Sequence, residues 1–142
     1  MSMPAQGQLT ELLEDEAIEL LASVPMGRLV FTMGGLPTVR PLNYVVDDGA
    51  VVIRTHHGSS TLSCVGSIVA FEADTVDLTT RTGWSVVVTG PAVLVEEPST
   101  IARYAAMVRP WIDHGMTYVI RIKADVVNGF RLSALDPAEQ SR

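Results

Sequence analysis

The stretch RLVFTMGGLPTVRPLNYVVDDGAVVIRTH, residues 28–56, decides the fold. Its first apolar side chains recur at every second position, as in Leu29 and Phe31, and this period is typical of a β-strand with one buried face. A Gly-Gly pair at residues 34–35 and an Asp-Asp-Gly sequence at residues 47–49 mark two tight turns. The stretch therefore predicts consecutive antiparallel strands over about residues 28–33, 36–46 and 50–56.

The sequence on either side of this stretch adds more strands and two helices. Apolar residues recur at helical spacing in residues 9–24, with Thr10 as the expected N-cap, and again between Pro98 and Pro110. Pro37 and Pro41 cannot donate to a neighbouring strand, so we expect them at a sheet edge or a bulge. Further extended segments, separated by a polar loop over residues 74–83, are expected at residues 67–73, 84–96, 118–122 and 126–132. The pattern predicts a mainly β fold with flanking α-helices, a closed or nearly closed antiparallel barrel of about seven strands.

The composition fits one domain and argues against several functions. The 142 residues are 47% hydrophobic, which is enough for a substantial core. A formal net charge of -6 repels nucleic acid and anionic membranes. With a single cysteine and no visible secretory signal, we expect a cytoplasmic protein. The expected organisation is a flexible tail over residues 1–9, a domain over residues 10–133 and a flexible tail over residues 134–142.

Cations and hydroxyl groups gather in the segment from Arg40 to Thr61, in a chain that is otherwise acidic. Arg40 and Arg54 lie on neighbouring predicted strands, and a Gly58-Ser-Ser sequence precedes a short helix expected to begin near Ser60. Arginines, hydroxyls and helix N-terminal amides together make a favourable cradle for a phosphate. The alternative interpretation, with about even weight, is that both arginines only face water.

A series of short motifs occurs in an order that resembles a known family. The motifs lie between residues 12 and 132, and they read Gly27-Arg28-Leu29, Pro41-Leu42-Asn43-Tyr44, Arg54-Thr55 with the Gly58 loop, Phe71-Glu72-Ala73-Asp74, Gly83-Trp84-Ser85-Val86-Val87-Val88-Thr89-Gly90, Pro110-Trp111 and Tyr118-Val119-Ile120-Arg121-Ile122. This order is similar to that of the small FMN-binding split-barrel proteins of the pyridoxamine 5'-phosphate oxidase-like superfamily.

The resemblance implies a six- to seven-stranded split barrel that forms a homodimer, with an FMN in each of two clefts between the subunits. It implies a flavin-dependent oxidoreductase of unknown substrate, in which the flavin performs hydride transfer. The cofactor-binding residues that it implies, with the last three closing the cleft, are Arg40, Pro41, Leu42, Asn43, Arg54, Thr55, His56, Ser59, Ser60, Thr61, Trp84, Ser85 and Trp111.

One position departs from the family pattern, because relatives usually carry a lysine where this chain has Thr61. Losing a charged phosphate partner weakens binding by about 1.5–3 kcal/mol, and a protonated His56 or His57 would compensate only at lower pH. Two alternatives therefore stay open: a reductase that uses the deazaflavin coenzyme, and a non-enzymatic dimer that binds a small molecule.

Two other kinds of site have little support in the sequence. Adjacent His56 and His57 point to opposite faces of a strand, and with His114 and Cys64 they form no chelating spacing, so we expect no metal site. Ser85 has no acid-base partner at a recognisable spacing, which argues against serine hydrolysis.

Overall fold

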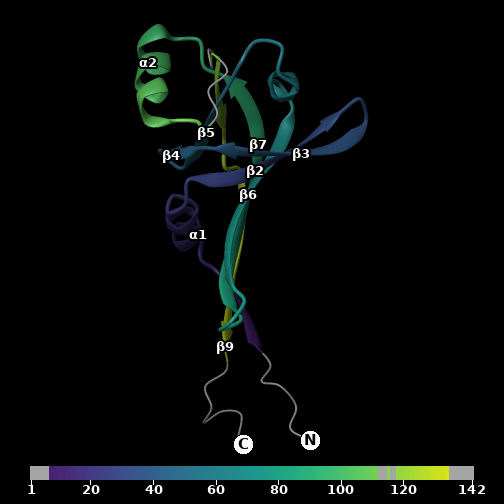
Figure 1. Ribbon diagram of the computed structural model, residues 1–142, viewed down its shortest axis with the longest axis vertical. Helices are drawn as coiled ribbons and strands as arrows, with labels where there is room; N and C mark the ends of the chain where they lie inside the picture. The colour runs from purple at the N-terminus through teal and green to yellow at the C-terminus, as the bar shows by residue number, and fades with distance from the viewer. Residues whose placement is uncertain (1–6, 112–114, 116–117, 135–142) are drawn as a thin grey trace, which may run out of the picture.

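The computed structural model describes residues 7–111, 115 and 118–134 of the chain (Figure 1). Within these residues, antiparallel pairing joins nine strands: β1 Gly7–Glu11, β2 Met26–Met33, β3 Leu36–Asn43, β4 Val45–Asp47, β5 Ala50–Thr55, β6 Ile68–Asp77, β7 Thr82–Leu94, β8 Tyr118–Ile122 and β9 Val126–Ala134. The three short helices are α1 Glu14–Leu21, η1 Ser60–Cys64 and α2 Pro98–Met107.

The strands form one sheet that is bent but not closed. Their order is β3-β2-β6-β7-β8-β5-β4, and β9 pairs with β7 while β1 pairs with β9. Strands that follow one another in the chain form hairpins at the tight turns predicted from the sequence. One example is the hairpin of β2 and β3, which turns at Gly34 and Gly35. The end strands β3 and β4 do not pair with one another within the described residues. The mainly β split-barrel class predicted from the sequence is confirmed, with an open rather than a closed sheet.

The long strand β7 belongs to both halves of this sheet. Its first part, Gly83 to Thr89, pairs with β9, and its last part, Ala92 to Leu94, pairs with β8. The change of partner occurs around Gly90, where an added Cβ would lie 1.9 Å from the carbonyl oxygen of Lys123. Only a glycine allows this close approach of the two backbones.

The main core fills the concave side of the sheet. Alternate side chains of β2, β5, β6, β7 and β8 point into it, and α1 covers one end through Ala17 and Leu21. A smaller apolar cluster lies on the other side of β5 and β8, where α2 packs through Tyr104 and Val108 onto Val52 and Val119. In the view of Figure 1, α1 and α2 both lie to the left of the long strands β6 and β7.

Three local expectations from the sequence were wrong. Residues 7–9, expected in the N-terminal tail, belong to β1, because this segment pairs with β9 from Gly7↔Ala134 to Glu11↔Phe130. Thr10, expected as a helix N-cap, also lies in β1, and α1 begins only at Glu14. The expected loop over residues 74–83 is shorter, since β6 continues to Asp77 and β7 starts at Thr82.

The remaining parts of the expected tails, residues 1–6 and 135–142, lie outside the described residues. Among the helices of the described part, none has the length and apolar character needed to cross a membrane.

Candidate functional site

Arg40 and the start of η1 come together across the surface of the sheet. The half-buried Arg40 lies on β3, and its Nη2 is 3.4 Å from the Ser60 Oγ, to which it donates. Ser59 is the N-cap of η1, because its Oγ accepts a hydrogen bond of 3.2 Å from the backbone N–H of Thr61. The structure thus places the Arg40 guanidinium beside the Ser60 hydroxyl at the capped start of η1, as part of the predicted anion cradle requires.

Arg54 turns its Nη1 toward a different element. It lies on β5 on the same face as Val52, which packs under α2. Its Nη1 donates to the carbonyl oxygens of Ala105 at 3.3 Å and Val108 at 3.0 Å. These carbonyls stand at the C-terminal end of α2, where a helix leaves acceptors unsatisfied and favours a cation. In these contacts Arg54 binds the end of α2 and does not join Arg40 in the anion site that the sequence had predicted.

The remaining polar side chains of the segment divide between the interior and the surface. Thr55 and Thr61 are buried, at 2% and 3% exposure. The Nδ1 of His56 lies 3.0 Å from the carbonyl oxygen of His57, and the Nδ1 of His57 lies 3.4 Å from the hydroxyl of Tyr118. The histidines thus contact the strand end and the loop beside them.

Asn43 ties the end of β3 to two other segments. Its Nδ2 donates to the carbonyl oxygen of Pro25 at 3.1 Å, and its Oδ1 accepts from the backbone N–H of Trp111 at 2.8 Å. Both ends of the amide are thus used within the chain. Next to it, Leu42 packs against the core, and Pro41 is exposed at the sheet edge that the sequence predicted.

The residues expected to close the cleft do not form one surface, because Trp84 and Ser85 point to opposite faces of β7. Trp84 points to the concave face of β7 and lines a cavity of about 390 Å³ together with Arg131. Ser85, the next residue, faces the opposite side of the sheet and pairs across the strands with Asp74 and Phe130. The side chain of Trp111 is 70% exposed.

The convex face of the sheet carries an apolar row that crosses five strands. In register across β3, β2, β6, β7 and β9, it consists of Val39, Val30, Ala70, Thr89 and Val126. We call these residues the convex row. Its outermost side chains are half exposed, 51% for Val39 and 52% for Val126. No helix of the described part packs on them, since α1 and α2 lie elsewhere.

A charged cluster lies beside the convex row and was missed from the sequence. Arg28 Nη1 is 2.8 Å from Glu72 Oε2 and 3.7 Å from Asp74 Oδ2. The other carboxylate oxygen of Glu72 is buried and has no hydrogen-bond partner among the described atoms. Burial and the neighbouring Asp74 raise the pKa of Glu72. A single glutamate inside the apolar segment 67–73 was the available signal.

Comparison with known proteins assigns this fold to a family. The model of the pyridoxamine 5'-phosphate oxidase family matches residues 14–142. The chain belongs to the pyridoxamine 5'-phosphate oxidase family. It is 44% identical over 133 residues to the uncharacterized protein Rv0080 of Mycobacterium tuberculosis, a match that covers 89% of this chain and 88% of that protein.

Two solved structures support the same family assignment. A protein of Corynebacterium glutamicum, which carries the provisional name of a pyridoxamine 5'-phosphate oxidase, is 33% identical with a TM-score of 0.75 and covers 96% of this chain and 99% of its own. The FAD binding protein of Mycobacterium smegmatis is 30% identical with a TM-score of 0.70 and covers 87% of this chain and 98% of its own. The pyridoxamine 5'-phosphate oxidase family thus includes flavin-binding homologues of this chain.

In this member of the pyridoxamine 5'-phosphate oxidase family, the position expected to carry a lysine presents no side chain to the surface. Thr61 is buried, and only its backbone N–H takes part in the cap of η1. Arg40, Ser59 and Ser60 line none of the cavities of about 490, 370 and 390 Å³ in the described residues. Of the residues considered and rejected as a metal site, His114 lies outside the described residues.

Proposed function

We propose that this protein is a homodimeric flavin-binding oxidoreductase that binds FMN between its subunits, with the phosphate held by Arg40 and the start of η1. The observation that carries the proposal is the approach of Arg40 Nη2 to the Ser60 Oγ at 3.4 Å. Guanidinium and hydroxyl donors that converge on a helix start are suited to a phosphate oxygen cluster. The flavin-binding relative from Mycobacterium smegmatis supports a flavin as the source of that phosphate.

The charge of the cradle favours a flavin with one phosphate. FMN and FAD share the phosphate attached to the ribityl chain, so the same donors serve both molecules. Among the described residues, Arg40 donates to the start of η1, whereas Arg54 Nη1 donates to the end of α2. A diphosphate would need further cationic donors, because each charged phosphate oxygen left without a partner is costly to desolvate. We therefore propose FMN, with FAD as the competing ligand in the test.

A second copy of the chain is needed to complete a cleft for the flavin ring. Arg40 lies on β3 at the edge of the sheet, whereas small-molecule sites bury most of their ligand. The convex row includes Val39, which stands one residue before Arg40 on the edge strand β3 and points to the opposite face, since Arg40 pairs with the buried Leu29. Half-exposed valines at the two ends of this row make it a suitable surface to bury against a partner. We propose that two convex rows pack together and that the partner extends around the edge strand β3 to supply the second wall beside Arg40.

The chain's own residues have a binding and orienting role in this proposal. The bound flavin supplies the hydride chemistry, so no side-chain acid or base is required. Pro41 presents an apolar, exposed surface next to Arg40 on the edge strand. The Asn43 amide, fixed by Pro25 and Trp111, holds the end of this strand in place.

The proposal is tested by titration and sedimentation of the full-length protein. We expect saturable FMN binding with a visible flavin spectrum, tighter than FAD binding, and a dimer in sedimentation analysis. Stronger binding of FAD than of FMN would identify FAD as the cofactor in place of FMN. Saturable binding of the deazaflavin coenzyme alone would identify a deazaflavin-dependent reductase, and binding of none of the three would overturn the proposal.

The dimer is tested by placing a charge on the convex row. Val39→Glu should convert the dimer to a monomer and abolish FMN binding, because a buried carboxylate without a partner is strongly unfavourable. Leu78→Glu is the matched control, since Leu78 is 86% exposed in the turn after β6 and lies outside the row. A dimer that survives Val39→Glu would disprove the proposed contact.

A further inference from the structure

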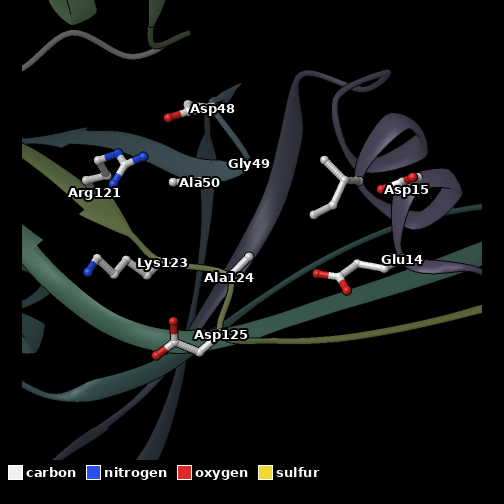
Figure 2. A pocket seen from close by; sticks show the side chains of 10 residues that line it. Glu14, Asp15, Asp48, Gly49, Ala50, Arg121, Lys123, Ala124 and Asp125 are labelled. Atoms are coloured by element: carbon white, nitrogen blue, oxygen red, sulfur yellow. The ribbon is translucent and has the colours of Figure 1, made fainter.

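Two cavities of the described part share one wall beside the end of β8. Their volumes are about 490 and 370 Å³, and both are lined by Asp48, Arg121 and Lys123. Figure 2 shows the larger cavity, with Arg121 and Lys123 on one side of the open space. We call the two connected cavities the β8 groove, because β8 ends between them.

Two cations of the β8 groove are available to a ligand. Arg121 lies on β8 and Lys123 directly follows this strand, so the two alternate with the buried Ile122 and share one face. In the part of the chain that the structure describes, neither side chain forms a hydrogen bond or a salt bridge. Both side chains border the two cavities, where an anion could reach them.

A third cation of the groove, Arg103 on α2, is already neutralised. Its Nη2 is 3.2 Å from Asp47 Oδ2, and its guanidinium lies 4.5 Å from the ring centre of Tyr104. The Tyr104 hydroxyl donates to the same carboxylate oxygen at 2.6 Å. These contacts lower the pKa of Asp47, with the hydrogen bond from Arg103 as the largest cause. Asp47 therefore makes its direct contacts with Arg103 and Tyr104, whereas Arg121 acts on it only as a nearby charge without a hydrogen bond.

The smaller cavity adds an apolar surface beside the two cations. Val93, Leu94 and Val95 line it from the end of β7 and the residue after it. Val93 pairs directly with Arg121 across the two strands, and its side chain is 48% exposed. An exposed valine that lines a cavity next to an unpaired guanidinium is suited to a ligand with both an apolar body and a negative group.

The opposite side of the groove limits the charge of this ligand. Glu14 and Asp15 from the first turn of α1 face Lys123 and Arg121 across the larger cavity, and Asp125 lies below them (Figure 2). A further carboxylate, Asp48, lines both cavities on the side of Arg121. These carboxylates repel a dianion such as phosphate more strongly than a monoanion. The planar carboxylate also matches the donor geometry of a guanidinium.

We propose that the β8 groove binds a small monocarboxylic acid, with its carboxylate on Arg121 and Lys123 and its apolar body on Val93 and Val95. The site is separate from the surface proposed for the flavin, because none of the residues that line the groove belongs to β3 or η1. Its ligand is thus a second small molecule, recognised by a different part of the fold.

The experiment is a titration of the isotope-labelled full-length protein with sodium benzoate, followed by NMR. We expect saturable shifts at the backbone amides of Val93 and Arg121, and saturable shifts with sodium hexanoate as well. The double variant Arg121→Gln with Lys123→Gln should weaken benzoate binding by tenfold or more, at an unchanged unfolding temperature. Arg81→Gln is the matched control, since Arg81 is exposed in the β6–β7 turn and outside the groove.

Three results would overturn this inference: no saturable shift with either acid, equal benzoate affinity in the double variant, or saturable binding of inorganic phosphate at the same amides with equal affinity. If the double variant does not fold, the single Lys123→Gln variant at the exposed position takes its place and should weaken binding at least threefold. Because the titration is independent of FMN, its failure would leave the flavin proposal untouched.

Discussion

Arg54 Nη1 donates a hydrogen bond to the carbonyl oxygen of Val108, 3.0 Å away, and so links β5 to the C-terminal end of α2. The same nitrogen reaches the carbonyl oxygen of Ala105 at 3.3 Å. Two acceptors that would otherwise be unsatisfied at the helix end are thereby paired with a cation. This arginine, which the sequence suggested as a phosphate ligand, has a clear structural function within the subunit.

Replacing Arg54 should therefore destabilise the fold. We expect Arg54→Met to lower the free energy of unfolding by about 1.5–3 kcal/mol, because the hydrogen bonds that it removes involve a charged donor. Urea unfolding followed by circular dichroism measures the change. Arg109→Met is the control, since Arg109 is exposed near the same helix end and has one long contact, 3.5 Å to the Ala106 carbonyl oxygen. Equal stability of the two variants would contradict the assigned role.

Replacing Arg40 should instead affect the ligand. We expect Arg40→Met to weaken FMN binding by about 10- to 100-fold, the equivalent of losing one charged hydrogen-bond partner. The free energy of unfolding should change little, because Arg40 has only a long contact to Ser60 and one to the adjacent Val39 carbonyl oxygen. Fluorescence titration with FMN measures the affinity, with Arg109→Met again as the control. An unchanged dissociation constant would remove Arg40 from the proposed site.

The strand crossing at Gly90 should tolerate no side chain. An alanine Cβ there would lie 1.9 Å from the Lys123 carbonyl oxygen and 2.9 Å from its carbon, both of them backbone atoms that cannot rotate away. We expect Gly90→Ala to lower the free energy of unfolding by about 3 kcal/mol or more. Gly34→Asn is the control, because an added Cβ at Gly34 meets no atom within 4 Å and asparagine tolerates its positive φ. Similar stability of both variants would refute the close approach.

Glu72 should make the stability of the protein depend on pH. Burial and Asp74 raise the pKa of Glu72 in the folded state, so folding favours its protonated form. The penalty for the charged form is present above the raised pKa and disappears as the pH falls below the ordinary glutamate value, about 4.3. We therefore expect Glu72→Gln to unfold at a higher temperature than the natural chain at pH 8, with the difference vanishing near pH 4. Glu19→Gln, exposed on α1, is the control. A lower unfolding temperature for Glu72→Gln at pH 8 would contradict the raised pKa.

The sequence predicts much of the fold because most strands carry their own signal. Alternation in residues 28–33 and the turns at residues 34–35 and 47–49 locate β2, β3 and β5 within a few positions. The single strand expected over residues 36–46 is divided, because β3 pairs with β2 as far as Asn43 and β4 pairs with β5 instead. β1 has no such signal, since all five of its residues are exposed and it forms only by pairing with β9. Thr10 looked like a helix cap because its hydroxyl and the acidic residues after it fit that pattern locally, but the distant partner Arg131 decides its conformation.

The candidate site is less predictable, because its side chains choose partners far along the chain. Arg54 reaches residues 51 and 54 positions away, and Asn43 accepts from Trp111, which is 68 positions away. No local pattern distinguishes an arginine that caps a helix from one that faces a phosphate. The approach of Arg40 to Ser60 follows more directly from the sequence, since a cation and a capped helix start are both recognisable in it.

The shared strand β7 has a consequence for how the molecule comes apart. One end of β7 pairs with β6 and β9, and the other end pairs with β8, so neither half of the sheet keeps its central hydrogen bonds if this strand detaches. If one half opens and β7 detaches, the strands of the other half lose the strand with which they pair. The two halves should therefore unfold as one cooperative unit. The slowest-exchanging amide protons of the protein should lie in the middle of β7, around Val86 to Val88.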